Sequence, residues 1–204
     1  MEDAKAEAAP ESTVQRVAGA IRANNIEVRV VDTGEDARRG VLQLIPLGAE
    51  VHSGKSKTLV DTGLWAELFE SGRYDALRPK YMKMDRATQE REIRKMISAP
   101  DYMVGSVHAI TEAGDLVTAS ATASQLGPYA VGAGKLILVA GSQKIVPDLD
   151  AALKRIEEVV RPWEDASVME RMKTHTIVGK ILIIRREWQP GRTTVFLVRE
   201  PLGV

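Results

Sequence analysis

The chain has no cysteine among its 204 residues, and this absence removes several kinds of chemistry. Without thiols it forms no disulfide, carries no thiolate nucleophile and offers no sulfur ligand to zinc or to an iron–sulfur cluster. The three histidines, His52, His108 and His175, do not stand at a short metal-binding spacing such as H-E-x-x-H. The sequence therefore identifies no metal site and no resident cofactor in this chain.

An excess of either charge is also lacking, since 28 Lys and Arg residues balance 28 Asp and Glu residues. A dedicated nucleic-acid surface needs a basic excess to release the counterions of the phosphates. Aromatic residues are few, at 4%, and the three tryptophans are too dispersed to form a platform for stacked bases. We expect no nucleic-acid partner.

No run of apolar residues approaches the ~18 that a transmembrane helix needs, so we expect no membrane partner. Residues 1–11 are acidic and rich in Ala and Glu, unlike a signal peptide. They predict a frayed tail on a cytoplasmic protein. The hydrophobic fraction of 44% is enough for a packed core, and the length fits one domain.

Helices and strands are predicted to alternate along the chain. Capping residues and apolar periodicity predict helices that begin at Ser12, Asp32, Asp85 and Asp148, and one that follows the small-residue turn at 54–58. The helix from Asp148 should end at Pro162, with a connector over 163–174. Strands are expected over residues 26–31, 49–53, 102–110, 116–120, 136–140, 177–185 and 194–199.

This alternation is typical of an α/β protein whose mainly parallel sheet is flanked by helices on both faces. Gln189-Pro190-Gly191 has good turn chemistry, so the last two strands are expected to form a C-terminal antiparallel hairpin at an edge of the sheet. The chain is interpreted as a single domain. Residues 1–31 hold the N-terminal tail, a helix and the first strand, and residues 32–204 form the main unit.

Ligands of parallel sheets bind beyond the carboxyl ends of the strands, and this rule selects three candidate places. The first is the turn Ser53-Gly54-Lys55-Ser56-Lys57-Thr58, between a predicted strand and a helix. Its backbone N–H groups, hydroxyls and ammonium groups could hold an anion. It is not a Walker A loop, because the second Gly and the Gly-Lys-Ser/Thr order are missing. The alternative is a helix cap with solvated lysines.

The second place is Thr111-Glu112-Ala113-Gly114, which follows an apolar strand. A carboxylate there could be a nucleophile, a general base or a ligand anchor. Gly114 would permit a close approach or a positive φ. A β-turn with an exposed Glu is the alternative, and composition alone favours it.

The third place is a cluster of small and polar residues, Ser124, Gln125 and Gly127, followed by Gly132 and Gly134. Small residues there would let a ligand approach the backbone, or they would form a tight crossover. No G-x-G-x-x-G fingerprint stands at any strand-to-helix junction, which argues against a dinucleotide site.

Several segments together resemble one family. They are residues 105–117 (GSVHAITEAGDLV), 124–130, 134–141 and 143–150, with 50–59 upstream and 192–203 at the end. In order and spacing they are similar to the LUD domain, the lactate-utilisation protein family, over about Asp32 to Val204.

The resemblance implies an α/β fold of the NagB/RpiA/CoA-transferase-like superfamily. It also implies a link to the oxidation of L-lactate to pyruvate beside iron–sulfur oxidoreductase partners. Any iron–sulfur chemistry would belong to such a partner, because the chain has no cysteine. The turn from Ser53 to Thr58 resembles the phosphate-holding turn of the related sugar-phosphate isomerases. Glu112-Ala113-Gly114 resembles the Glu-x-Gly motif that supplies the glutamate nucleophile of CoA-transferases.

Three functions remain open at this point. The chain is an accessory or ligand-binding subunit in lactate utilisation, or a free-standing binder or transferase-like enzyme for an anionic metabolite that uses Glu112. Acyl-CoA, a nucleotide, a folate and a sugar phosphate are the candidate metabolites. The third function is a non-catalytic interaction protein. A homo-oligomer is compatible with all three.

Overall fold

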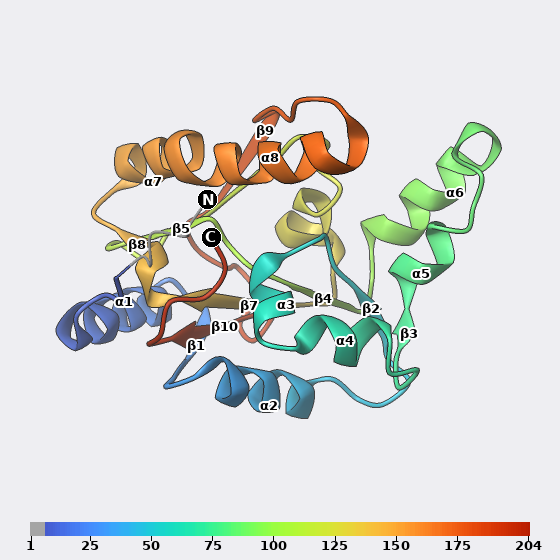
Figure 1. The fold of residues 1–204 in the computed structure, drawn as a ribbon. Helices are drawn as coiled ribbons and strands as arrows, with labels where there is room; N and C mark the ends of the chain where they lie inside the picture. The colour runs from blue at the N-terminus through green and yellow to red at the C-terminus, as the bar shows by residue number, and fades with distance from the viewer. Residues whose placement is uncertain (1–6) are drawn as a thin grey trace.

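The structure is a computed structural model that describes residues 7–204 (Figure 1). Residues 1–6 of the predicted tail lie outside the described residues. For the rest of that segment the prediction of a frayed tail is wrong, because the Ala9 N–H donates to Ser142 Oγ at 3.1 Å and Glu11 already begins helix α1 (Glu11–Ala23).

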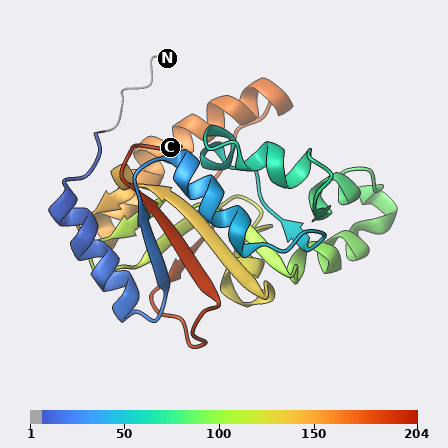
Figure 2. The same ribbon diagram turned by 90° about the horizontal axis from the view of Figure 1, so that it is seen from below.

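A six-stranded sheet, all parallel, forms the centre of the fold. Its order is β1 (Glu27–Val31), β10 (Thr193–Val198), β7 (Lys135–Gly141), β4 (Tyr102–Gly105), β2 (Glu50–His52) and β3 (Asp75–Ala76). Figure 2 shows β1, β10 and β7 side by side. Every residue of β10 is buried, as expected for a central strand that is covered on both faces.

One face of this sheet is covered by α2 (Gly34–Leu44), α3 (Lys57–Asp61) and α4 (Leu64–Phe69) (Figure 1). The helix predicted after the turn at 54–58 is two helices, because Gly63 takes a left-handed conformation (φ 74°) that ends the first. The short α5 (Leu77–Tyr81) and the longer α6 (Arg86–Ser98) follow and project from the body as an arm.

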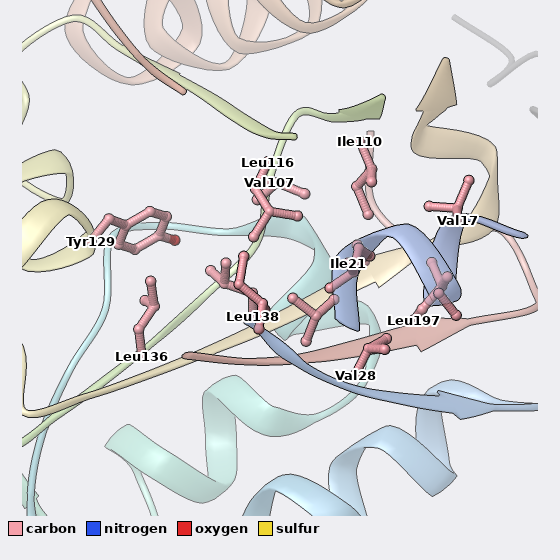
Figure 3. Close-up of a cluster of buried hydrophobic side chains, with 14 of the residues drawn as sticks. Val17, Ile21, Val28, Val107, Ile110, Leu116, Tyr129, Leu136, Leu138 and Leu197 are labelled. Carbon is pink, nitrogen blue, oxygen red and sulfur yellow. The ribbon is translucent and has the colours of Figure 1, made fainter. Parts of the chain in front are cut away.

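The other face is covered by α1 and by a second, mixed sheet. The order of the second sheet is β8 (Ile145–Val146), β5 (Ala109–Thr111), β6 (Leu116–Ser120) and β9 (Lys180–Ile184). Figure 3 shows the core between the layers, where Ile21 of α1, Leu138 of β7 and Ile110 of β5 meet. The α/β fold with a mostly parallel, helix-flanked sheet is thus confirmed, with the second sheet as an addition.

The predicted C-terminal hairpin is wrong. β9 pairs antiparallel with β6 in the second sheet, whereas β10 lies parallel between β1 and β7 in the first. The apolar β10 is buried along its whole length, as in a central strand covered on both faces, while β9 has exposed residues that suit an edge. The predicted turn at Gln189-Pro190-Gly191 is present, and its Gly191 has φ 71°. It does not join two paired strands, because it leads the chain from the second sheet to the first.

The strand predicted over 102–110 is likewise divided between the two sheets. β4 ends at Gly105, and the segment 106–108 carries the chain to β5. The Ser106 N–H is bound by the Tyr129 hydroxyl instead of a neighbouring strand, so strand pairing stops there.

The connector predicted over 163–174 is helical. α7 (Leu149–Arg155) passes through a π-helical turn, Ile156–Val160, into α8 (Arg161–Met172). Pro162 does not end the helix, because it closely follows the π-helical turn, where the regular hydrogen bonding of the α-helix is already interrupted. Figure 1 shows α7 and α8 on the side of the molecule opposite to α2, with the sheets between them.

The predicted helix starts are correct in two cases. Asp85 and Asp148 accept hydrogen bonds from the backbone N–H groups of Ala87 and Ala151. Asp32 is not a cap, since its neighbour Thr33 forms the capping box with Asp36. Ser12 lies inside α1, whose N-cap is Pro10.

Candidate functional site

A cavity of about 480 Å³ opens where the ends of β2, β4 and β6 face α8. This volume is in the range of small-molecule sites. Its wall includes the turn at 53–58, the segment 105–108 after β4, the segment 118–122 at the end of β6, and residues of α8 and the chain that follows it.

Lys144, just beyond the carboxyl end of β7, forms the polar end of the cavity. Its side chain is 2% exposed. The Nζ donates to Thr58 Oγ1 and Ser106 Oγ, both at 3.0 Å, and to the Val107 carbonyl at 3.1 Å. All three partners also line the cavity, and the Thr58 hydroxyl is 3.2 Å from the Ser106 hydroxyl.

This ammonium group has only neutral hydrogen-bond partners, and its burial lowers its pKa to about 7. Arg155 and Lys57 act in the same direction, whereas Asp61 raises the pKa. Nearby, burial together with Lys144 lowers the pKa of His108 to about 3, so its ring is neutral at pH 7. Its Nδ1 accepts from the Ala119 N–H at 2.9 Å, which leaves the ring proton on Nε2.

Tyr129 fixes the backbone of Ser106 with two hydrogen bonds. Its hydroxyl accepts from the Ser106 N–H and donates to the Ser106 carbonyl, both at 3.1 Å. The ring is buried in the core, where Figure 3 shows it near Leu136. Burial raises the pKa of the Tyr129 hydroxyl far above its usual range, so it stays protonated.

The cavity wall is rich in cations. Its basic side chains are Lys55, Lys57, Arg78, Lys144, Arg161 and Arg171, and its acidic side chain is Glu164. Three of the cations are neutralised, because Lys57 pairs with Asp61, Arg161 with Glu157 and Arg171 with Glu164.

Three of these cations have neutral partners instead. Lys55 Nζ donates to Ser167 Oγ at 3.2 Å, Arg78 to the Tyr81 hydroxyl at 3.0 Å, and Lys144 as described above. Within residues 7–204 these three form no ion pair with a carboxylate. The cavity therefore carries positive charge that the described residues leave uncompensated.

The π-helical turn, α8 and the chain after it add apolar side chains to the lining beside their charged ones. These are Ile156, Val160, Val168, Met172, Ile177 and Val178. The cavity is therefore amphipathic, and a ligand with an anionic group and a less polar body fits this lining.

The structure brings the first and third predicted places together. Ser53, Gly54, Lys55, Ser56, Lys57, Thr58, Ser124 and Gln125 all line the cavity. A Cβ on Gly54 would lie 3.6 Å from the Cβ of Gln125. Ser56 caps α3, since its Oγ accepts from the Leu59 N–H, while Ser120 Oγ and Ser124 Oγ both bond Gln125 Oε1. Gly127 lies outside the lining, ahead of the π-helical turn Pro128–Gly132.

The second predicted place is elsewhere. Thr111, Glu112 and Gly114 form the turn between β5 and β6 and do not line the cavity. The half-exposed Glu112 pairs with Arg16 of α1 at 2.8 Å. Gly114 has both features predicted for it, with φ 86° and a backbone packed against α1. A smaller hollow beside this turn is lined by Thr111, Ala113 and Asp115, and Glu112 is not part of its lining. The nucleophile hypothesis for Glu112 stays a prediction.

Sequence reasoning missed Lys144, Ser106, His108 and the wall from α8. Lys144 and Ser106 follow the ends of β7 and β4, so the strand-end rule applied to those strands would have found them. The wall from α8 was missed because Pro162 was interpreted as a helix end.

Residues 7–204 show neither a metal-binding cluster nor a membrane-spanning helix. No group of three or more His, Asp or Glu side chains is placed to hold a metal ion. No helix in this part of the chain is long and apolar enough to cross a membrane.

Comparisons with known proteins agree with the fold. No match is found among curated proteins. A crystal structure of a DUF162 family protein from Deinococcus radiodurans is similar, with a TM-score of 0.53 and 12% sequence identity over 92% of this chain and 96% of that chain. At that identity the likeness shows the fold alone. The model of the LUD domain matches residues 14–198, so the chain belongs to the LUD domain family.

Proposed function

We propose that the cavity binds a small anionic metabolite. The observation that carries the proposal is the set of Lys55, Arg78 and Lys144, three basic side chains that line the cavity and whose hydrogen-bond partners are neutral. Lys55 is exposed, Arg78 is partly exposed and Lys144 is buried. Basic side chains that no carboxylate neutralises give the cavity a positive potential, which attracts an anionic ligand. Because the whole chain has no net charge, this attraction is local to the cavity.

The polar and apolar parts of the lining indicate how such a ligand would lie. Its anionic group would sit among the hydroxyls and amines of the turn at 53–58 and of Ser106. Its less polar part would contact Val168 and Met172 of α8. The candidates are 2-hydroxy and 2-oxo acids, acyl-CoA, nucleotides, folates and sugar phosphates. The cavity is large for a three-carbon acid alone, which favours the larger members.

We also propose a role in lactate utilisation, with the chain as the ligand-binding subunit beside an iron–sulfur oxidoreductase in the cytoplasm. Membership of the LUD domain family supports this proposal. The absence of cysteine assigns the cluster to the partner. Co-purification of the tagged chain with an iron–sulfur protein at native expression is the test. A chain recovered alone, with neighbouring genes unrelated to lactate, would contradict this role and leave the anion site untouched.

Thermal unfolding in the presence of each metabolite class tests the anion site. A ligand present at about 100 times its Kd should add about 2.7 kcal/mol to the free energy of unfolding. Isothermal titration calorimetry then gives the Kd. If no anion in the panel shifts the Tm, the proposal fails and the interaction-protein alternative becomes the better one.

Matched variants separate the cavity from the rest of the surface. Lys55→Ala and Arg78→Ala should each weaken binding by about tenfold, the loss of one charged contact. Lys154→Ala is the control, because Lys154 is exposed, pairs with Glu158 and does not line the cavity. Glu112→Ala should leave the Kd unchanged, whereas the Glu112 hypothesis requires binding to be lost.

A further inference from the structure

Lys144 is unusual among the basic residues because it is buried and bonded only to neutral groups. Its Nζ contacts two hydroxyl oxygens and one backbone carbonyl, and no carboxylate of the described residues pairs with it. A neutral amine suits these partners well. It donates its two N–H groups to two of these oxygens, and its one lone pair accepts from a hydroxyl until that hydroxyl rotates away and leaves the lone pair free to attack a ligand.

We propose that Lys144 is a carbonyl-reactive amine that forms an imine with a 2-oxo acid bound in the cavity. The inference rests on the proposed anion site, because the carboxylate of a 2-oxo acid needs the surrounding cations. It goes further by naming the carbonyl group as the part of the ligand that faces Lys144. The residue would then touch the reacting atoms and act as a catalytic residue.

The reaction balances without an oxidant or a reductant. The lone pair of Nζ attacks the carbonyl carbon, and a carbinolamine forms when a proton moves from nitrogen to oxygen. Loss of the hydroxyl group with a second proton from nitrogen releases one water and leaves a C=N bond between Lys144 and the substrate carbon. Hydrolysis reverses every step.

Two hydroxyls are placed to carry the protons. Thr58 Oγ1 and Ser106 Oγ each lie 3.0 Å from Nζ and 3.2 Å from one another, so they form a closed group of three. They are positioning residues, which orient the amine and pass protons between nitrogen and oxygen. Tyr129 fixes Ser106 through both of its backbone polar groups.

The charges around Lys144 favour the neutral amine. Arg155 of α7 and Lys57 of α3 favour the neutral form, Asp61 of α3 opposes it, and the nearby His108 is itself neutral. Burial is the largest effect and, with the two cations, brings the pKa of Lys144 to about 7 from its usual 10.5. At neutral pH a large fraction of Lys144 is therefore nucleophilic, unlike a surface lysine.

Reductive trapping tests the inference on the full chain. The protein is incubated with pyruvate or 2-oxoglutarate and sodium cyanoborohydride, and the intact mass is measured. We expect one adduct per chain, with the mass of the oxo acid less one oxygen, and peptide mapping should place it on Lys144. The trapping rate should rise as the pH passes through about 7 and then level off. Modification of surface lysines would continue to rise toward pH 10.

Variants sharpen the assignment. Lys144→Met keeps the length of the side chain and should lose the adduct, while the exposed Lys154→Met control should keep it. Thr58→Val should slow trapping by about tenfold, as loss of one hydrogen bond predicts, and Thr58→Ser should restore it. Where Lys144→Met fails to fold, the peptide map of the wild-type adduct decides.

The outcomes separate the two proposals. L-lactate cannot form an imine, so binding of both L-lactate and pyruvate without any adduct would overturn the role of Lys144 and keep the anion site. An adduct on Lys144 with the neutral aldehyde propanal, in a protein that binds no anion, would keep the amine and overturn the anion site. Adducts spread over several lysines with no preference for Lys144 would overturn the inference.

Discussion

The hydroxyl of Tyr129 occupies the space that a side chain on Gly105 would need. A Cβ on Gly105 would lie 1.8 Å from that oxygen, and the same oxygen makes both hydrogen bonds to the backbone of Ser106. The last residue of β4 is therefore a glycine so that Tyr129 can hold the start of the segment 106–108. This contact links a core residue to the position of Ser106 beside Lys144.

Gly105→Ala should lower the free energy of unfolding by about 1–3 kcal/mol, the usual cost of overpacking a core. Because Ser106 would move with Tyr129, binding of an anion in the cavity should weaken as well. Urea unfolding and titration calorimetry measure the two effects. Gly127→Ala is the matched control, since a Cβ there meets no atom within 4 Å. A Gly105→Ala protein as stable as the wild type would contradict this account of the contact.

The Glu112-Ala113-Gly114 turn gives a second prediction, in which the glycine matters more than the glutamate. Gly114 has φ 86°, and a Cβ on it would lie 2.9 Å from the Ala20 carbonyl carbon and the Ile21 nitrogen. Gly114→Ala should therefore cost about 1–3 kcal/mol in unfolding free energy. Glu112→Ala breaks only an exposed ion pair with Arg16, worth at most about 1 kcal/mol.

Ligand affinity distinguishes the two interpretations of that turn. Glu112→Ala should bind anions as the wild type does. Loss of binding in Glu112→Ala at unchanged stability would restore the nucleophile hypothesis, because the side chain would then have to reach a ligand that the cavity does not hold.

The buried ion pair of Arg192 and Glu187 holds the π-helical turn Pro128–Gly132 and gives a third prediction, which concerns stability. Arg192 bonds Glu187 Oε1 at 2.7 Å and also donates to the carbonyls of Pro128, Tyr129 and Ala133, which surround the π-helical turn. Removal of one partner leaves a buried charge, so Glu187→Ala should cost about 3–5 kcal/mol. The exposed pair of Arg161 and Glu157 is the control, and Glu157→Ala should cost no more than about 1 kcal/mol. Equal costs in urea unfolding would mean that burial does not strengthen the pair.

Sequence patterns predicted the parallel sheet because its strands carry their own signal. Leu136 to Ala140 is an uninterrupted apolar run, and such a run has to be buried on both faces. The capping residues Asp85 and Asp148 also act locally, through the first turn of their own helices. Such features can be predicted from the local sequence, because they do not depend on contacts with distant segments.

The features that the sequence could not predict depend on contacts between distant segments. The division between β4 and β5 follows from Tyr129, 23 positions beyond Ser106. The separation of β9 from β10 depends on which strand pairs with each, and Gln189-Pro190-Gly191 fits either arrangement. Lys144 looks like an ordinary lysine in the sequence, since only folding places it 3.0 Å from Thr58, 86 positions away.

Two histidines with lowered pKa values, the buried His52 and the half-buried His108, give the last prediction, a loss of stability in mild acid. Burial, with a smaller effect of Arg78, lowers the pKa of His52 to about 4, and burial lowers that of His108 to about 3. In the unfolded chain both titrate near 6.5. Between pH 6.5 and 4 the unfolded chain therefore binds more protons, so the folded state loses stability as the pH falls. At pH 5 the loss relative to neutral pH should be roughly 2 kcal/mol for each histidine.

Urea unfolding at a series of pH values measures this slope. His52→Phe keeps a ring against Tyr81, and His108→Gln keeps an acceptor for the Ala119 N–H. Each variant should therefore reduce the dependence of the unfolding free energy on pH by the contribution of one histidine. Tyr81→Phe alters the contact of His52 without removing a histidine and should keep the slope. Lys144 acts in a separate window, because its lowered pKa makes stability rise with pH between about 7 and 10.5. A slope below pH 6.5 that persists in the double variant would assign the acid sensitivity to carboxyl groups instead of these histidines.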